Sequence, residues 1–177
     1  MKTLPREEGS KKWDDFWNSL KEEWFKVEVL QDYSGEDHGE SLSLWLEGKK
    51  EESMAVLMKQ DNQEWKKALE DTKDAKKIRL HVVERPLTAY LEWEVEVYKR
   101  QNIPLGEEVY LVEKTDVIHL EIPDGDFMLF DNKKAIKNTY DKTGKCYQYD
   151  FYDEGNDISK FLHLKSELIR FAQPLKV

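Results

Sequence analysis

The residues best placed to do chemistry lie at positions 83–94, where an apolar run is followed by helix-forming residues. Open α/β sheets bind ligands where a strand ends and a helix begins, because the free N–H groups and dipole of the helix can hold an anion there. Arg85 would add a positive charge at that point. The stretch has no glycine-rich loop, so it predicts an anion or ligand site without a phosphate cradle. The alternative is a polar turn in which Arg85 pairs with an acid.

Glu94 is the most informative acid of this stretch. It follows Tyr90 by one helical turn, and on the apolar face that Tyr90 and Leu91 define it should point partly inward. A half-buried carboxylate must find a partner. It could act as a base with a raised pKa, and the simpler alternative is a structural hydrogen bond to an arginine, a tyrosine or the backbone. Trp93 on the same helix and Arg85 before it complete this set of candidate contact residues.

Two further acids, Asp126 and Asp131, lie at the ends of an apolar strand. Paired carboxylates can hold a divalent metal or share acid–base work. A straight strand between them would hold their side chains about 16 Å apart, which is too far for one site. We therefore expect each of them to cap a turn and to support the strand edges beside the ligand or partner site.

Other catalytic arrangements find no support in the residues. The four histidines are neither spaced by four on a helix nor next to Cys146, which argues against zinc: His38, His81, His119 and His163. His163 and Lys165 match the HxK of phospholipase D-type phosphodiesterases, but Arg170 stands where the following aspartate should be. The chain also has no Gly-x-Ser-x-Gly elbow. No catalytic residue, metal or cofactor is predicted.

Composition limits the class of protein. The chain has 177 residues and a formal net charge of −9, from 37 acidic and 28 basic side chains. One cysteine excludes a disulfide framework, no apolar run approaches the ~18 residues of a membrane-spanning helix, and the N-terminus lacks the apolar core of a secretory signal. Direct nucleic-acid binding needs clustered lysine and arginine. We therefore expect a cytoplasmic protein that binds neither membranes nor nucleic acid directly.

Apolar periodicity predicts an α+β fold. We expect a flexible arm at residues 1–9 and a single domain at residues 10–177, with a helical part at 10–75 and a sheet part at 76–177. The helical part is predicted to contain a helix from Ser10 to about Glu23, a strand at 25–29, a helix ended by Gly48, and a helix from Asp61 to Ala75.

The sheet part is predicted to open with a β-α-β unit at 78–113, in which Pro86 begins the helix and the two strands are parallel. A largely antiparallel strand run should follow, at 116–123, 126–131, 135–141 and 146–153. A closing helix from about Asn156 to Ala172 should end before Pro174. The stretch 146–157 holds four acids and no base, which makes it a candidate partner surface.

Several motifs match a family of unknown function that is common in actinomycetes. The chain reads IRLHVVERPLTAYLEWE where family members carry sequences like RVRVVSEPLTDYIRWE, and its DFMLFD corresponds to their DFWLFD. Gly106-Glu107-Glu108 is similar to their GED-type turn, and Tyr140 to Gly144 to their YD-x-x-G turn. DDFWNSLKEEWFKVEVLQDY also resembles the family's opening helix and strand. The chain therefore resembles this family over most of its length.

The chain departs from the family pattern in three places. Met128 replaces the tryptophan of DFW, and a lysine- and glutamate-rich stretch at 47–75 looks like an insertion. The basic residues of the family's strand are fewer here: Lys76, Lys77, Arg79 and His81. An electrostatic partner carried over from the family is weakened accordingly.

The resemblance implies a function without catalysis. The family has no established activity, its members are often encoded beside helix-turn-helix regulators, and its C-terminal half looks like the sensor portion of such regulators, a relative of the phospholipase D-like fold without the catalytic residues. We therefore predict a regulatory or sensor-like domain that binds a protein partner, such as a DNA-binding regulator, or a small effector. The alternatives are a phosphodiesterase-like or other hydrolase and, from charge alone, an acidic mimic of nucleic acid. The candidate contact residues are Arg85, Tyr90, Trp93, Glu94, Asp126 and Asp131.

Overall fold

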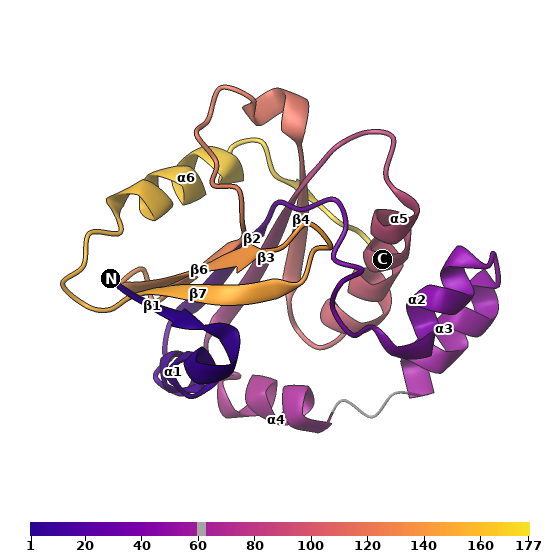
Figure 1. Ribbon diagram of the computed structural model, residues 1–177, viewed down its shortest axis with the longest axis horizontal. Coiled ribbons are helices and arrows are strands. Elements are labelled where there is room, and N and C mark those ends of the chain that lie inside the picture. The colour runs from indigo at the N-terminus through magenta and orange to yellow at the C-terminus, as the bar shows by residue number, and fades with distance from the viewer. Residues whose placement is uncertain (60–62) are drawn as a thin grey trace.

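The chain folds into a mixed β-sheet with helices on both faces (Figure 1). The computed structural model describes residues 1–59 and 63–177, without the side chains of 63–65. Within these ranges the helices are α1 (Arg6–Asn18), α2 (Gly39–Leu46), α3 (Lys50–Lys59), α4 (Gln63–Asp71), α5 (Ala89–Val97) and α6 (Ser159–Ile169). The strands are β1 (Lys2–Pro5), β2 (Glu23–Glu28), β3 (Lys76–Val83), β4 (Glu108–Glu113), β5 (Phe127–Phe130), β6 (Lys134–Tyr140), β7 (Cys146–Tyr152) and β8 (Gln173–Pro174). The predicted α+β class is confirmed.

The sheet has the strand order β1-β7-β6-β5-β2-β3-β4-β8. Strands β2, β3 and β4 are parallel, and α5 connects β3 to β4 as a β-α-β unit requires. Strands β5, β6 and β7 form an antiparallel run beside β2. A sheet of this kind brings the ends of β2 and β3 next to the start of β5, although these segments are far apart in the chain.

Strand β3 shows how the two faces of the sheet differ. Ile78, Leu80 and Val82 point to one face, where they pack with apolar residues of α6 in a large core. Arg79 and His81 point to the opposite face, because successive side chains of a strand alternate. Two smaller apolar clusters lie on that opposite face, one beneath α1 and α4 and one beneath α2, α3 and α5. The buried polar residues lie between these two clusters.

The start of the chain differs from the expected flexible arm at 1–9. Lys2–Pro5 form the edge strand β1, which pairs antiparallel with β7, and α1 begins at Arg6 rather than at Ser10. Arg6 donates to both carboxylate oxygens of Glu36 at 2.6 Å, which ties this segment to the rest of the fold. The pairing partner lies about 145 residues further along the chain, so local patterns could not predict it.

Three other expectations need correction. Residues 116–123 are not a strand: a short 3-10 helix (Lys114–Val117) and irregular chain replace it, and β8 pairs with β4 instead. Pro86 does not begin α5, which starts at Ala89 after Thr88 accepts a hydrogen bond from the Leu91 N–H. The division into a helical part at 10–75 and a sheet part at 76–177 does not hold either, because the strand predicted at 25–29 is present as β2 and lies in the middle of the sheet. The predicted cap Asp61 lies outside the described residues.

Within residues 1–59 and 63–177, no helix is both long enough and apolar enough to cross a lipid bilayer.

Candidate functional site

A group of charged side chains is buried on the face of the sheet opposite α6. Lys26 and Glu28 alternate with apolar residues along β2, and Arg79 and His81 do so along β3. The parallel register places Lys26 opposite Arg79 and Glu28 opposite His81. Two central strands therefore present four polar side chains to one face, between the two apolar clusters.

Arg79 is the central cation of this group. Its Nη1 donates to Oε1 of Glu28 at 2.7 Å and its Nε donates to Oε2 of Glu107 at 2.7 Å. Burial lowers the pKa of Arg79, but the two carboxylates outweigh this effect and raise it well above the usual value. Burial likewise opposes ionisation of Glu28, but Arg79 and Lys26 outweigh it and hold the pKa of Glu28 far below its usual value. These groups remain charged at neutral pH although they are buried.

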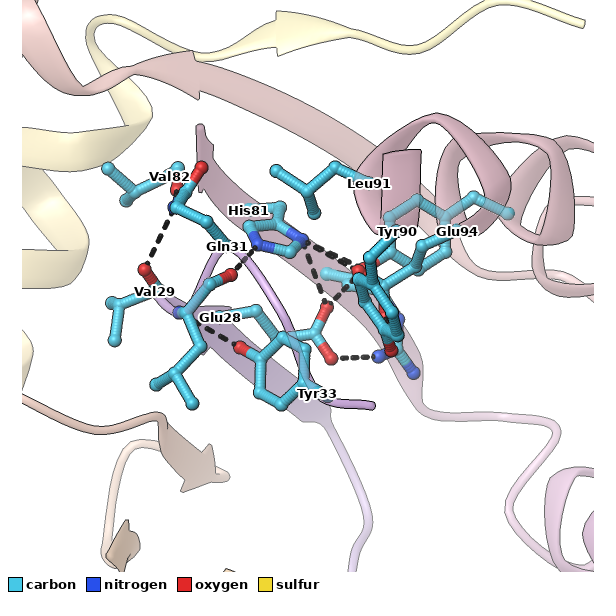
Figure 2. Close-up of polar contacts among 12 residues, drawn as sticks. Glu28, Val29, Gln31, Tyr33, His81, Val82, Tyr90, Leu91 and Glu94 are labelled. Carbon is cyan, nitrogen blue, oxygen red and sulfur yellow. Dashed lines mark hydrogen bonds and ion pairs between the residues drawn. The ribbon is translucent and has the colours of Figure 1, made fainter. Parts of the chain in front are cut away.

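His81 joins the strands to the helical layer (Figure 2). Its ring is fully buried, and Nε2 lies 2.8 Å from the Leu30 carbonyl, which assigns the ring proton to Nε2. Nδ1 lies 3.0 Å from the hydroxyl oxygen of Tyr98, and the single proton of that hydroxyl is donated to Oε2 of Glu28 at 2.7 Å. Burial lowers the pKa of His81. At neutral pH the ring is therefore a neutral link between Glu28 and the helical layer.

Asp126 adds a second carboxyl group from the start of β5. It is fully buried and accepts hydrogen bonds from the Val29 N–H at 3.0 Å, the Tyr33 hydroxyl at 2.8 Å and the Tyr140 hydroxyl at 2.7 Å. Burial raises its pKa. This residue therefore holds the chain after β2 and the end of β6 together at the site.

Glu94 completes the group from α5 and differs from the other acids. Its Oε1 accepts a hydrogen bond from the Tyr90 hydroxyl at 3.3 Å. Its buried Oε2 has no hydrogen-bond partner among the described residues, and Nδ1 of His81 lies 3.4 Å from it. Burial and the neighbouring Glu28 carboxylate raise the pKa of Glu94 to about 8. Figure 2 shows Tyr90 and Glu94 on the helix that faces His81 and Glu28.

Two adjoining hollows open beside this network, and both are lined by Glu94 and His38. The first has a volume of about 270 Å³ and is lined also by Arg79, Trp93, Val97, Tyr98, Gln101, Asn102 and Leu105. The second has a volume of about 330 Å³ and is lined also by Arg6, Lys26, Glu28, Tyr33, Glu36, Tyr90, Asn138, Tyr140, Cys146 and Tyr149. The second volume lies near the lower end of the range for small-molecule sites, which runs from about 300 to 1,000 Å³. We refer to the two hollows together as the Glu94 cleft.

The structure brings together four of the six candidate residues. Tyr90, Trp93 and Glu94 line the cleft. Asp126 accepts hydrogen bonds from the hydroxyls of Tyr33 and Tyr140, which also line it. The sequence allowed Glu94 to be either a base with a raised pKa or a structural hydrogen-bond partner. Both features are present, since Oε1 accepts from the Tyr90 hydroxyl, Oε2 has no hydrogen-bond partner among the described residues, and the pKa is raised. Whether these residues bind a ligand or partner remains a prediction.

Arg85 and Asp131 lie elsewhere. Arg85 is exposed and pairs with Glu113 at 3.0 Å, as the alternative interpretation of that turn requires. Asp131 lies at the far end of β5, where its carboxylate accepts from the backbone N–H groups of residues 21–23. Both side chains are occupied by contacts within the fold, and neither reaches the Glu94 cleft.

Most of the buried polar partners were not predicted from the sequence: Lys26, Glu28, Tyr33, His38, Arg79, Tyr98, Glu107 and Tyr140. A signal for part of this group was present. Polar residues occupy every second position of two otherwise apolar strands, at 26 and 28 and again at 77, 79 and 81. On buried strands this pattern indicates that both faces are covered and that one of them holds a charged network.

The described residues contain no group of three or more histidine, cysteine, aspartate or glutamate side chains with the geometry to hold a metal ion. The site instead combines paired charges, hydroxyl groups and one unpaired carboxylate oxygen, which suits hydrogen bonding to an organic molecule.

Comparison with known protein families finds a match that covers most of the chain. The model of a domain of unknown function, DUF6879, matches residues 11–177. The chain belongs to the DUF6879 family. Comparison with curated proteins finds no match. Apart from Arg6, the residues of the buried network and of the Glu94 cleft lie within the matched part of this DUF6879 domain, whereas the family's distribution and its association with regulators stay predictions.

The raised pKa of Glu94 predicts how stability depends on pH. Its folded-state pKa of about 8 exceeds the ordinary value of 4.5, so folding favours the protonated form. This contribution to stability is complete below pH 4.5 and is lost as the pH rises through 8. We expect Glu94→Gln to become more stable relative to the wild type by roughly 4 kcal/mol between pH 5 and pH 9. Urea unfolding at both pH values measures this, and parallel stability profiles would contradict it.

Proposed function

We propose that this protein is a non-catalytic regulatory domain that binds a small effector in the Glu94 cleft and communicates with a protein partner. The observation that carries the proposal is the carboxyl group of Glu94, a residue that lines a cleft of ligand size and whose buried Oε2 has no hydrogen-bond partner among the described residues. Buried polar atoms are nearly always hydrogen-bonded. A bound molecule that donates to Glu94 would complete the site.

The surroundings of the cleft support binding rather than catalysis. The charged groups of β2 and β3 are paired within the fold, so they form a rigid wall. Cys146 lines the cleft, but burial raises the pKa of its thiol and disfavours the nucleophilic thiolate. Trp93 is packed against His38, with ring centroids 5.0 Å apart, and donates to Ser41. A ligand at Glu94 would therefore contact α5 and the segment that leads into α2.

That connection gives the proposed effector a way to influence a partner. His38 bonds to the Tyr33 carbonyl and also to Tyr90, so it links the segment before α2 to α5. A ligand that orders this segment would change the surface of α2 and α3. The partner that we propose is a DNA-binding regulator of the helix-turn-helix class, as the family resemblance implies.

Thermal unfolding in the presence of a metabolite collection tests effector binding. A ligand at a hundredfold excess over its Kd should raise the Tm by roughly 5 to 10 °C. We expect this rise in the wild type and in Glu92→Gln, whose exposed carboxylate on the same helix makes it a matched control. The rise should be absent in Glu94→Gln. A collection that yields no stabilising compound, or one whose effect does not depend on Glu94, contradicts the proposal.

A second candidate function, a phosphodiesterase-like or other hydrolase, is favoured by one observation. Glu28 and Glu94 both approach Nδ1 of His81, at 3.9 and 3.4 Å, yet one carboxyl has a lowered pKa and the other a raised one. Pairs of titratable groups with separated pKa values are typical of acid–base catalysis. Hydrolysis of p-nitrophenyl phosphodiesters and esters tests this, since an enzyme should show activity that falls as the pH rises through 8 and that Glu94→Gln abolishes.

A further inference from the structure

Two residues that line the second hollow of the Glu94 cleft, Glu94 and Asn138, each carry a buried oxygen atom without a partner. Oε2 of Glu94 and Oδ1 of Asn138 are both buried without a hydrogen-bond partner among the described residues, and their residues are 9% and 7% exposed. The Asn138 amide cannot simply turn over, because its Nδ2 donates to the Tyr140 hydroxyl at 3.0 Å while Tyr140 donates to Asp126. The hollow therefore offers two oxygen atoms that need N–H or O–H donors.

The charges around the cleft are also unbalanced. Three cations line it, and each is paired: Arg6 with Glu36, Lys26 with Glu28, and Arg79 with Glu28 and Glu107. The carboxyl groups of the same network are five: Glu28, Glu36, Glu94, Glu107 and Asp126. Two carboxyl groups are thus left without a cation. Asp126 has three donors of its own, so Glu94 is the carboxyl group that has neither a cation nor a full set of donors.

We propose that the ligand of the Glu94 cleft is a small organic ammonium, which donates N–H groups to Oε2 of Glu94 and Oδ1 of Asn138. This inference rests on the proposed function and names the chemical class of the effector. An ammonium supplies the missing positive charge and the missing donors at once. The ionised form of Glu94 would repel an anion, and a neutral alcohol would not compensate the charge of that form. The neighbouring tyrosine and tryptophan rings would also favour a cation, because the face of an aromatic ring attracts positive charge.

Binding of a cation should be coupled to a proton. In the free protein Glu94 is mostly protonated at neutral pH, and the ammonium binds the ionised form. Binding therefore releases a proton, and the affinity should fall about tenfold for each pH unit below 8. Several titratable or charged groups surround Glu94: Tyr90, Tyr98, Glu28, Lys26, Arg79, His81, Tyr33, His38 and Asp126. The pH dependence of the affinity can therefore be assigned to Glu94 only if it disappears in Glu94→Gln.

Three four-carbon probes of matched length test the ligand class. Titration calorimetry at pH 8 with 1,4-diaminobutane, 1,4-butanediol and succinate should show binding of the diamine alone. Glu94→Gln should weaken it by about 10- to 100-fold, as expected for the loss of a charged hydrogen bond. Glu92→Gln should bind like the wild type. Diamine binding that Glu94→Gln leaves unchanged would overturn the inference, as would the absence of diamine binding.

The wild-type protein provides a test that does not depend on a variant. Diamine titrations at pH 7 in phosphate and in Tris should differ in heat, because the released proton is taken up by buffers of different ionisation enthalpy. Equal heats would overturn the inference. Succinate or butanediol binding that requires Glu94 would overturn it as well but would leave the proposed effector function standing. The metabolite screen tests that function separately.

Discussion

Replacing Arg79 by methionine should destabilise the protein by about 3 to 5 kcal/mol, the usual cost of removing one partner from a buried ion pair. The variant leaves Glu28 and Glu107 buried without their shared cation, at 3% and 2% exposure. Because methionine fills much of the space of the arginine, the loss of stability measures the removal of the charge and not the creation of a cavity. Urea unfolding at pH 7 measures the change.

Arg85→Met is the matched control for this substitution. Arg85 also pairs with a glutamate, Glu113, but its side chain is 55% exposed. Exposed ion pairs contribute only about 0 to 1 kcal/mol, so this variant should be almost as stable as the wild type. Equal effects of the two substitutions would show that the buried network does not stabilise the fold.

The Arg79 variant should also respond differently to pH. Arg79 is the largest of the charges that oppose the desolvation of Glu28, and without it only the weaker effects of Lys26, His81 and the Tyr98 hydroxyl remain, so the pKa of Glu28 should rise toward or above its ordinary value. A carboxyl group whose folded-state pKa is raised favours folding at low pH. The destabilisation caused by Arg79→Met should therefore be smaller at pH 5 than at pH 8, and the same unfolding measurements test this.

Asp126→Ala should cost about 3 kcal/mol or more. Three donors lose their acceptor: the Val29 N–H and the hydroxyls of Tyr33 and Tyr140. Each buried donor left without an acceptor costs about 1 to 3 kcal/mol, and water that enters the vacated space would recover only part of this. Because the two tyrosines line the Glu94 cleft, the variant should also weaken any ligand that depends on Glu94.

Asp124→Ala is the control at a neighbouring position. Asp124 is two residues earlier, and its side chain is 93% exposed with one ion pair to Lys137. Its removal should change the free energy of unfolding by less than about 0.5 kcal/mol. A similar loss for both aspartates would mean that the hydrogen bonds of Asp126 are not what holds the segment after β2.

The sequence by itself determined the elements whose residues interact locally. The apolar stripe of Trp13, Phe16 and Trp17 predicted α1, and both Phe16 and Trp17 are buried. The relation of Tyr90 to Glu94 is also local, because residues one turn apart on a helix are neighbours. This spacing was enough to predict a half-buried carboxylate that needs a partner, an arginine, a tyrosine or the backbone, and in the structure the Tyr90 hydroxyl is that partner.

Only the tertiary structure decided which strands are neighbours, and with that the composition of the site. Arg79 lies 51 residues from Glu28, and Asp126 lies 93 residues from Tyr33. Alternation along β2 and β3 can place polar residues on one face, but it carries no information on which strand lies beside which or in what register. Strand pairing is settled by the packing of the whole sheet. The same packing separated Arg85 and Asp131 from the site and joined Glu28, Arg79 and Glu94 in it.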